Sequence, residues 1–137
     1  MSETKSLTIA SSYERRTDAT LRKLFPNHEF KKVRPEWLLN DYPGRKHPAQ
    51  PLELDFFCER LMLAVEVQGE QHRFIVPAFH GEGEQARKAL WAQQRRDQTK
   101  RDLCKKFRVD LVEVWFDQNI EHVLSSHPLI RQHLHSA

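Results

Sequence analysis

The sequence predicts an α/β protein, on the border of the α+β class, in which helices flank a mixed β-sheet with a central hairpin. Three observations support this prediction. Residues 52–68 contain two apolar, β-prone segments separated by the polar pair Glu59 and Arg60, which is typical of a hairpin. Residues 109–116 form a third apolar segment with the character of a buried strand. Segments with helical patterns precede, separate and follow these strands.

The first helix is predicted at residues 12–25. Ser11 and Glu14 have the spacing of a capping box, in which two side chains bond the free backbone N–H groups at the start of a helix. Apolar side chains then recur at helical spacing, and Pro26 ends the pattern.

The remaining elements are predicted from prolines, glycines and charge. A short strand is expected at residues 29–33, within a proline-rich irregular segment. A loop at residues 75–83 leads into a long basic helix at residues 82–107. The closing helix, at residues 119–135, contains Pro128, which lacks a backbone N–H and should interrupt or kink it.

Length and composition indicate a single domain. The chain has 137 residues, so we expect one domain at residues 11–137 after a flexible tail at residues 1–10. Charged residues make up 30% of the chain and no apolar run is long enough to span a bilayer, so we expect no membrane association. Cys58 and Cys104 are the only cysteines, which argues against a disulfide framework and favours a reducing, cytoplasmic compartment.

Two acids in the hairpin are the strongest functional signal. If the turn is centred on Arg60 and Leu61, Asp55 faces Glu66 across the two strands. Opposed side chains lie about 4.5–5.5 Å apart at Cβ, so two like charges there need compensation. A divalent cation such as Mg²⁺ would provide it. The alternative is a solvated pair on a wet face, and a register slip of one residue would separate the acids.

Four further residues are candidates for the same site. Gln68 projects from the same face as Glu66, where its amide can contact a phosphate or a water. The backbone carbonyl of Val67 is a third candidate metal ligand. His72 is a candidate general acid or base, or simply an exposed loop histidine. Glu14 is either a capping residue alone or a helix acid that reaches the metal site.

The predicted helix at residues 82–107 is rich in lysine and arginine. A basic face beside a carboxylate site suits a polyanionic substrate, whereas a solvated, salt-bridged surface is the alternative. We expect Arg95, Arg96 and Arg101 to contact a nucleic-acid backbone. Spacing alone leaves open which helix residue faces the acids; the candidates are Gln94, Asp97, Lys100 and Arg101.

These residues together resemble a known superfamily. Residues 54–55, 63–72 and 97–101 resemble the motifs of PD-(D/E)xK nucleases, and are most similar to the compact branch related to very-short-patch-repair endonucleases. The resemblance implies a restriction-endonuclease-like fold and cleavage of nucleic acid with Mg²⁺, for which Mn²⁺ should substitute. It assigns the metal to Asp55 and Glu66.

This chain departs from the motif at two positions. Leu54 stands in place of the proline, and Gln68 stands in place of the lysine that orients the attacking water. Some members of the superfamily carry that lysine on a neighbouring helix, which makes Lys100 the candidate substitute.

The expected function is therefore a metal-dependent endonuclease that hydrolyses phosphodiester bonds of DNA. Two alternatives stay open, namely an RNA nuclease and a catalytically weak or inactive module that binds nucleic acid or a protein. Sequence preference would come from a protein partner, and cutting of both strands from a homodimer or from two visits.

Overall fold

The computed structural model describes residues 2–69 and 80–136, with side chains described for residues 12–69 and 80–135. The chain has an α+β fold in which helices flank a four-stranded mixed sheet of order β1-β2-β3-β4. This confirms the predicted fold class. The strands are β1 (Lys31–Val33), β2 (Leu54–Cys58), β3 (Leu63–Gln68) and β4 (Asp110–Trp115). The helices are α1 (Ser2–Leu24), α3 (Gly83–Lys106), α4 (Ile120–Ser126) and α5 (Pro128–Ser136).

Strands β2 and β3 form the predicted hairpin in the predicted register. Phe56 pairs with Val65 and Cys58 with Leu63, so the turn is centred on Arg60 and Leu61. The next position away from the turn brings Asp55 opposite Glu66. Because side chains alternate between the two faces of a strand, a shift of one residue would move Phe56 and Val65 away from their present face.

Strand β4 joins the other side of β3 in parallel. Its register sets Val65 beside Val112 and Glu66 beside Glu113. A parallel pair needs a long crossover, and α3 lies in the segment that connects the two strands.

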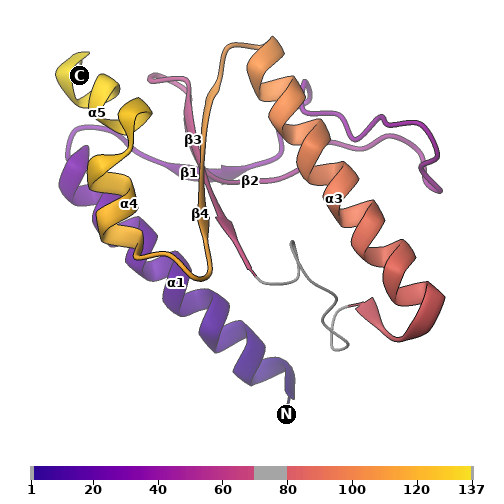
Figure 1. The fold of residues 1–137 in the computed structure, drawn as a ribbon. Coiled ribbons are helices and arrows are strands. Elements are labelled where there is room, and N and C mark those ends of the chain that lie inside the picture. The colour runs from indigo at the N-terminus through magenta and orange to yellow at the C-terminus, as the bar shows by residue number, and fades with distance from the viewer. Residues whose placement is uncertain (1, 70–79, 137) are drawn as a thin grey trace.

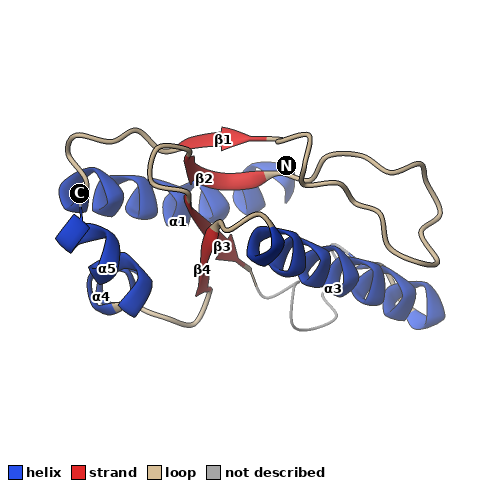
Figure 2. Ribbon diagram, turned by 90° about the horizontal axis from the view of Figure 1, so that it is seen from above, coloured by secondary structure: helices blue, strands red, loops and turns tan. Residues whose placement is uncertain are grey.

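The sheet separates two groups of helices (Figures 1 and 2). Helices α1, α4 and α5 cover one face, which is apolar along its length and includes Val65, Val112 and Val114. Helix α3 covers the other face and packs Cys104 against Phe57 and Ala64.

Helix α1 begins at Ser2, ten residues before the predicted start. It includes the segment in which a flexible tail was expected, and Ser11 lies inside it rather than at a cap. The physical reason is that no proline or glycine occurs before its end at Leu24, so the backbone N–H groups can bond in helical fashion throughout.

The closing segment confirms the predicted interruption. Helix α4 ends at Ser126 and α5 begins at Pro128. Proline is favoured at the first position of a helix because its missing N–H is not needed there. Within the described ranges, no helix combines the length and hydropathy needed to cross a bilayer.

Candidate functional site

Three carboxylates form a row across three neighbouring strands. Glu66 lies two residues after Ala64 of β3 and therefore projects from the same face, toward α3. Asp55 of β2 lies opposite Glu66, and Glu113 of β4 is its register partner on the other side. The polar end of the sheet face under α3 is therefore acidic.

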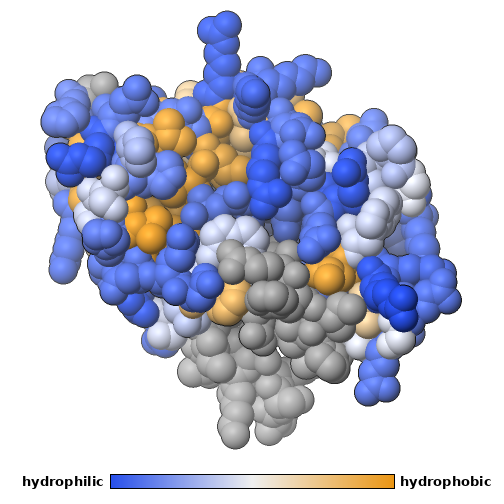
Figure 3. Space-filling view, in the orientation of Figure 1, coloured by the Kyte–Doolittle hydropathy of each residue, from blue (hydrophilic) through white to orange (hydrophobic). Residues whose placement is uncertain are grey.

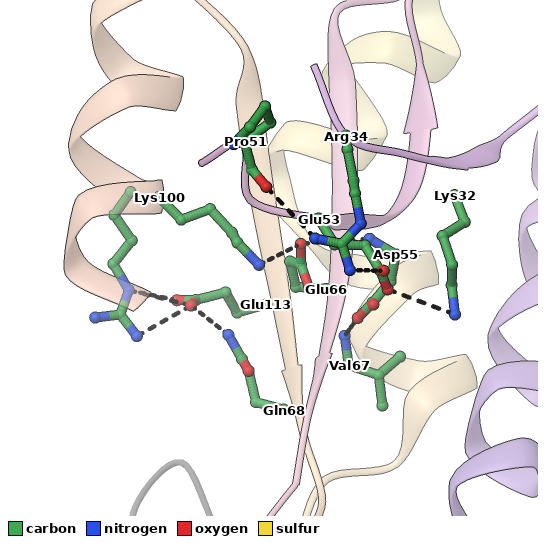
Figure 4. A network of polar contacts seen from close by, with 11 residues as sticks. Lys32, Arg34, Pro51, Glu53, Asp55, Glu66, Val67, Gln68, Lys100 and Glu113 are labelled. Atoms are coloured by element: carbon green, nitrogen blue, oxygen red, sulfur yellow. Dashed lines mark hydrogen bonds and ion pairs between the residues drawn. The ribbon is translucent and has the colours of Figure 1, made fainter. Parts of the chain in front are cut away.

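The carboxylates of Asp55 and Glu66 bond to each other's strand. The backbone N–H of Asp55 donates to Oε1 of Glu66 at 3.4 Å, and the N–H of Val67 donates to Oδ2 of Asp55 at 3.1 Å (Figure 4). These side chains take the place of the backbone carbonyls that would accept in a continuing ladder. The two acids are thus held between the strands rather than in open solvent.

Val67 offers a further oxygen at this position. In an extended strand, the N–H and C=O of one residue point to the same side. Because the N–H of Val67 faces Asp55, its carbonyl faces that side as well. The carbonyl of the next residue, Gln68, points the other way and accepts the N–H of Phe116 at 2.8 Å.

The chemistry of this donor set suits a hard divalent cation. Two carboxylates and one backbone carbonyl supply oxygen ligands, and Mg²⁺ usually completes its shell with water or phosphate. In the part of the chain that the structure describes, no three His, Cys, Asp or Glu side chains meet at metal-ligand spacing.

The pKa of Glu66 is strongly perturbed. It is raised from 4.5 to about 9; burial is the largest cause, and the charge of Asp55 and a hydrogen bond with Asp55 also raise it. The ammonium group of Lys100 opposes this rise. At neutral pH the metal-free pair of acids therefore retains a proton, as expected when two carboxyl groups share a site.

Lys100 is the helix residue that faces the acids. Its Nζ donates to Oε1 of Glu66 at 3.1 Å, and the two side chains are only 14% and 4% exposed. Lys100 lies one turn before Cys104, whose packing sets α3 against the sheet. Of the four candidates on this helix, the packing of α3 selects Lys100 for contact with Glu66.

A second polar group links Gln68, Glu113 and Arg101. The amide Nε2 of Gln68 donates to Oε1 of Glu113 at 2.9 Å. The Nε of Arg101 lies 3.1 and 3.0 Å from the two oxygens of Glu113. This hydrogen bonding raises the pKa of Arg101 above its usual value. The guanidinium of Arg101, expected to contact a nucleic-acid backbone, is thus directed to Glu113.

Glu14 forms an ion pair with Lys32 rather than a contact with the acid pair. The Nζ of Lys32 in β1 lies 3.8 Å from Glu14 and 3.6 Å from Glu53. Burial lowers the pKa of Lys32, but the nearby charges of Glu14, Glu53 and Asp55 outweigh it and raise the pKa overall. Glu14 of α1 is therefore joined through Lys32 to Glu53, the acid two residues before Asp55 in the chain.

Three predicted site residues, Arg95, Arg96 and His72, have no described contact with the acid pair. Arg95 and Arg96 lie on α3 and are partly exposed, with Arg96 one turn before Lys100. Hydrophilic residues cover most of the surface on the α3 side, whereas hydrophobic residues gather between α5 and the upper end of α3 (Figure 3). His72 lies outside the described residues.

Glu113 was not among the site residues predicted from the sequence. It is an acid between Val112 and Val114 in an apolar strand, which is the same signal that identified Asp55 and Glu66. The residues next to Glu113 in the sheet could not be predicted from local spacing, because the parallel pairing of β4 with β3 joins residues that are far apart in the chain.

Three viral proteins are similar to this chain. Uncharacterized protein 307L of Invertebrate iridescent virus 6 is 39% identical over 85 residues, 62% of this chain and 41% of its own length. Uncharacterized protein 094L of Frog virus 3 (isolate Goorha) is also 39% identical over 85 residues, 62% of this chain and 50% of its own length. Uncharacterized protein 033L of Invertebrate iridescent virus 3 is 36% identical over 97 residues, 71% of this chain and 43% of its own length.

The chain thus spans half or less of the length of these viral relatives. No family model matches the chain. No solved structure matches it either.

Proposed function

We propose that this chain is a Mg²⁺-dependent endonuclease that hydrolyses phosphodiester bonds of DNA. The observation that carries the proposal is the pair Asp55–Glu66, two carboxyl groups held together between strands with the ammonium group of Lys100 beside them. Like charges in a buried position are costly, and this cost is offset when a cation binds there.

Each residue of the site would have a distinct role in the reaction. Asp55, Glu66 and the carbonyl of Val67 would hold Mg²⁺, or Mn²⁺ in its place. When bound, the metal polarises a phosphoryl oxygen and makes water more acidic. Lys100 would donate a hydrogen bond to the reacting phosphate or water, and its positive charge would stabilise the negative charge there. Its Nζ already lies beside the carboxyl group of Glu66.

The charge of α3 supports a nucleic-acid substrate. The helix has eight lysines and arginines against three acids, and the latter include the buried Asp97. Arg95 and Arg96 precede Lys100 on this helix and would bind backbone phosphates near the cleaved bond. One such site cuts one strand, so a homodimer, a second visit or a specificity-giving protein partner belongs to the proposal.

A second candidate function follows from Gln68. This residue cannot supply the positive charge of a strand lysine, and its amide nitrogen is bound to Glu113. A module that binds nucleic acid or a protein without cutting is the function this observation favours. We also propose a reducing cytoplasm as its compartment, because Cys58 and Cys104 are both buried free thiols.

The experiment incubates purified protein with supercoiled plasmid, with duplex and single-stranded DNA, and with RNA, each with Mg²⁺, Mn²⁺ or EDTA. We expect cleavage of DNA with either metal and none with EDTA. Asp55→Asn and Glu66→Gln should remove it, while Glu59→Gln, an acid in the exposed turn of the same hairpin, should leave it unchanged.

The outcomes separate the candidates. Full activity in a folded Asp55→Asn or Glu66→Gln variant contradicts the metal-site assignment. Wild-type protein that binds DNA but cuts nothing supports the non-cutting module instead. Cleavage of RNA but not of DNA would identify the protein as an RNA nuclease.

A further inference from the structure

The orientation of the Gln68 amide is fixed by Glu113. Glu113 accepts hydrogen bonds from Arg101 through both oxygens, at 3.1 and 3.0 Å from Nε, with Nη2 also 3.0 Å from Oε1. A guanidinium is always a donor, and a carboxylate is only an acceptor. The group that meets Glu113 from β3 must therefore be a donor, and this selects the nitrogen of the Gln68 amide.

The amide of Gln68 consequently presents its oxygen on the side away from Glu113. Gln68 is 2% exposed and its Nε2 lies 2.9 Å from Glu113, so the side chain has little freedom to turn (Figure 4). It shares a face with Glu66, about 7 Å further along the strand. Its Oε1 is an acceptor, whereas a lysine at this position would be a donor.

The same carboxylate also fixes α3. Arg101 follows Lys100 directly, so the Arg101–Glu113 contact holds that turn of the helix against β4 while Lys100 contacts Glu66 on β3. Glu113 in β4 therefore positions two groups on the side of the sheet that carries Glu66. The ammonium group of Lys100 is a donor, and the amide oxygen of Gln68 is an acceptor.

We infer that Gln68 serves the reaction as the hydrogen-bond acceptor for the attacking water, and that Glu113 is the positioning residue that holds it in this role. This inference rests on the proposed function. The water donates one O–H to Oε1 of Gln68, no proton moves to the amide, and the lone pair of the water is directed to the phosphorus. As the new P–O bond forms, the P–O bond to the leaving sugar oxygen breaks, the attacking water loses a proton to solvent, and the leaving oxygen takes a proton from solvent. Lys100 supplies the positive charge that Gln68 lacks.

The test exchanges the two partners. In Gln68→Glu, two carboxylates face each other. In Glu113→Gln, the acceptor for both Gln68 and Arg101 is weakened. In the double variant, the new amide at position 113 can accept from Arg101 and donate to the new carboxylate at position 68, which restores both contacts.

We expect each single variant to lower kcat by about 10²-fold with little change in KM, since a misdirected water affects the chemical step. The double variant should recover most of this loss. Gln50→Glu, which adds the same charge at an exposed position outside α3, is the matched control and should leave kcat unchanged.

A measurement without turnover accompanies the kinetics. In metal-free wild-type protein, the side-chain amide protons of Gln68 should exchange slowly with solvent by NMR, and Glu113→Ala should abolish this protection. Unprotected amide protons in the wild type would overturn the inference, even if the exchanged variants fail to fold.

The kinetic outcomes distinguish the two levels of the proposal. Wild-type protein that cuts no nucleic acid contradicts the proposed function, and the role of Gln68 with it. Cleavage by the wild type, together with a folded double variant no better than the weaker single variant, contradicts only the role of Gln68 and Glu113.

Discussion

The ammonium nitrogen of Lys100 lies 3.1 Å from Oε1 of Glu66, although the two residues are 34 positions apart in the sequence. This contact joins the basic helix α3 to the acid pair on the hairpin. It places a cation beside the buried carboxyl group of Glu66.

Lys100→Ala should lower kcat for DNA cleavage by about 10²–10⁴-fold, the range for a group that orients or protonates at the reacting centre. Lys105→Ala removes an exposed lysine from the same helix and should have little effect. Single-turnover cleavage assays measure both. Equal activity of the two variants would show that the contact with Glu66 is only structural.

The stability of the metal-free protein should decrease as the pH rises. The pKa of Glu66 is about 9 in the folded protein and near 4.5 in the unfolded chain, so the folded state holds an extra proton between these values. Its free energy of unfolding should therefore fall through this window, by at most about 1.4 kcal/mol per pH unit.

Urea unfolding in EDTA at several pH values measures this slope. Glu66→Gln should flatten it and raise stability at the alkaline end, because an amide carries no proton to lose. Glu59→Gln changes an exposed acid and should keep the wild-type slope. Identical slopes in all three proteins would contradict a shared proton at Asp55 and Glu66.

Mg²⁺ should stabilise the folded protein. A ligand that binds only the folded state adds about 2.7 kcal/mol when its concentration is 100 times its Kd. The melting temperature of the wild type should therefore rise with Mg²⁺, whereas that of Asp55→Asn should not. Glu59→Gln is the control that should respond like the wild type. A metal response that survives in Asp55→Asn would place the cation elsewhere.

DNA binding should depend on salt through α3. Arg95→Glu and Arg96→Glu should weaken binding to all sequences alike, and each lost phosphate contact should reduce the log–log salt slope by about 0.9 on duplex DNA. Titrations in EDTA measure binding without cleavage. Arg22→Glu changes an exposed arginine of α1 that pairs with Asp18, and should leave the slope unchanged. A loss limited to one DNA sequence would indicate base recognition instead.

The hairpin shows how far local sequence information reaches. A turn centred on Arg60 and Leu61, assumed from the short polar break between two apolar runs, is the turn of the structure, and with it Asp55 and Glu66 come together. The start of α1 was wrong by ten residues, because a capping box marks a favourable start but does not prevent a longer helix.

The sequence alone did not predict the contact of Glu113, and it did not decide whether Lys100 or Arg101 faces Glu66. Glu113 has the same local signal as Glu66, yet its partner Gln68 is 45 positions away in the chain. The contact requires β4 to lie beside β3 and parallel to it, an arrangement that depends on the crossover through α3.

The sequence by itself therefore determined the strands, the hairpin register and the two acids, since these depend on alternation and on residues close together in the chain. The tertiary structure alone decided that Lys100 meets Glu66 and Arg101 meets Glu113. The physical reason is that the rotation of a helix on a sheet depends on how its buried side chains, such as Cys104, fit the sheet face. A rotation of one residue, about 100° on a helix, would exchange the two basic groups.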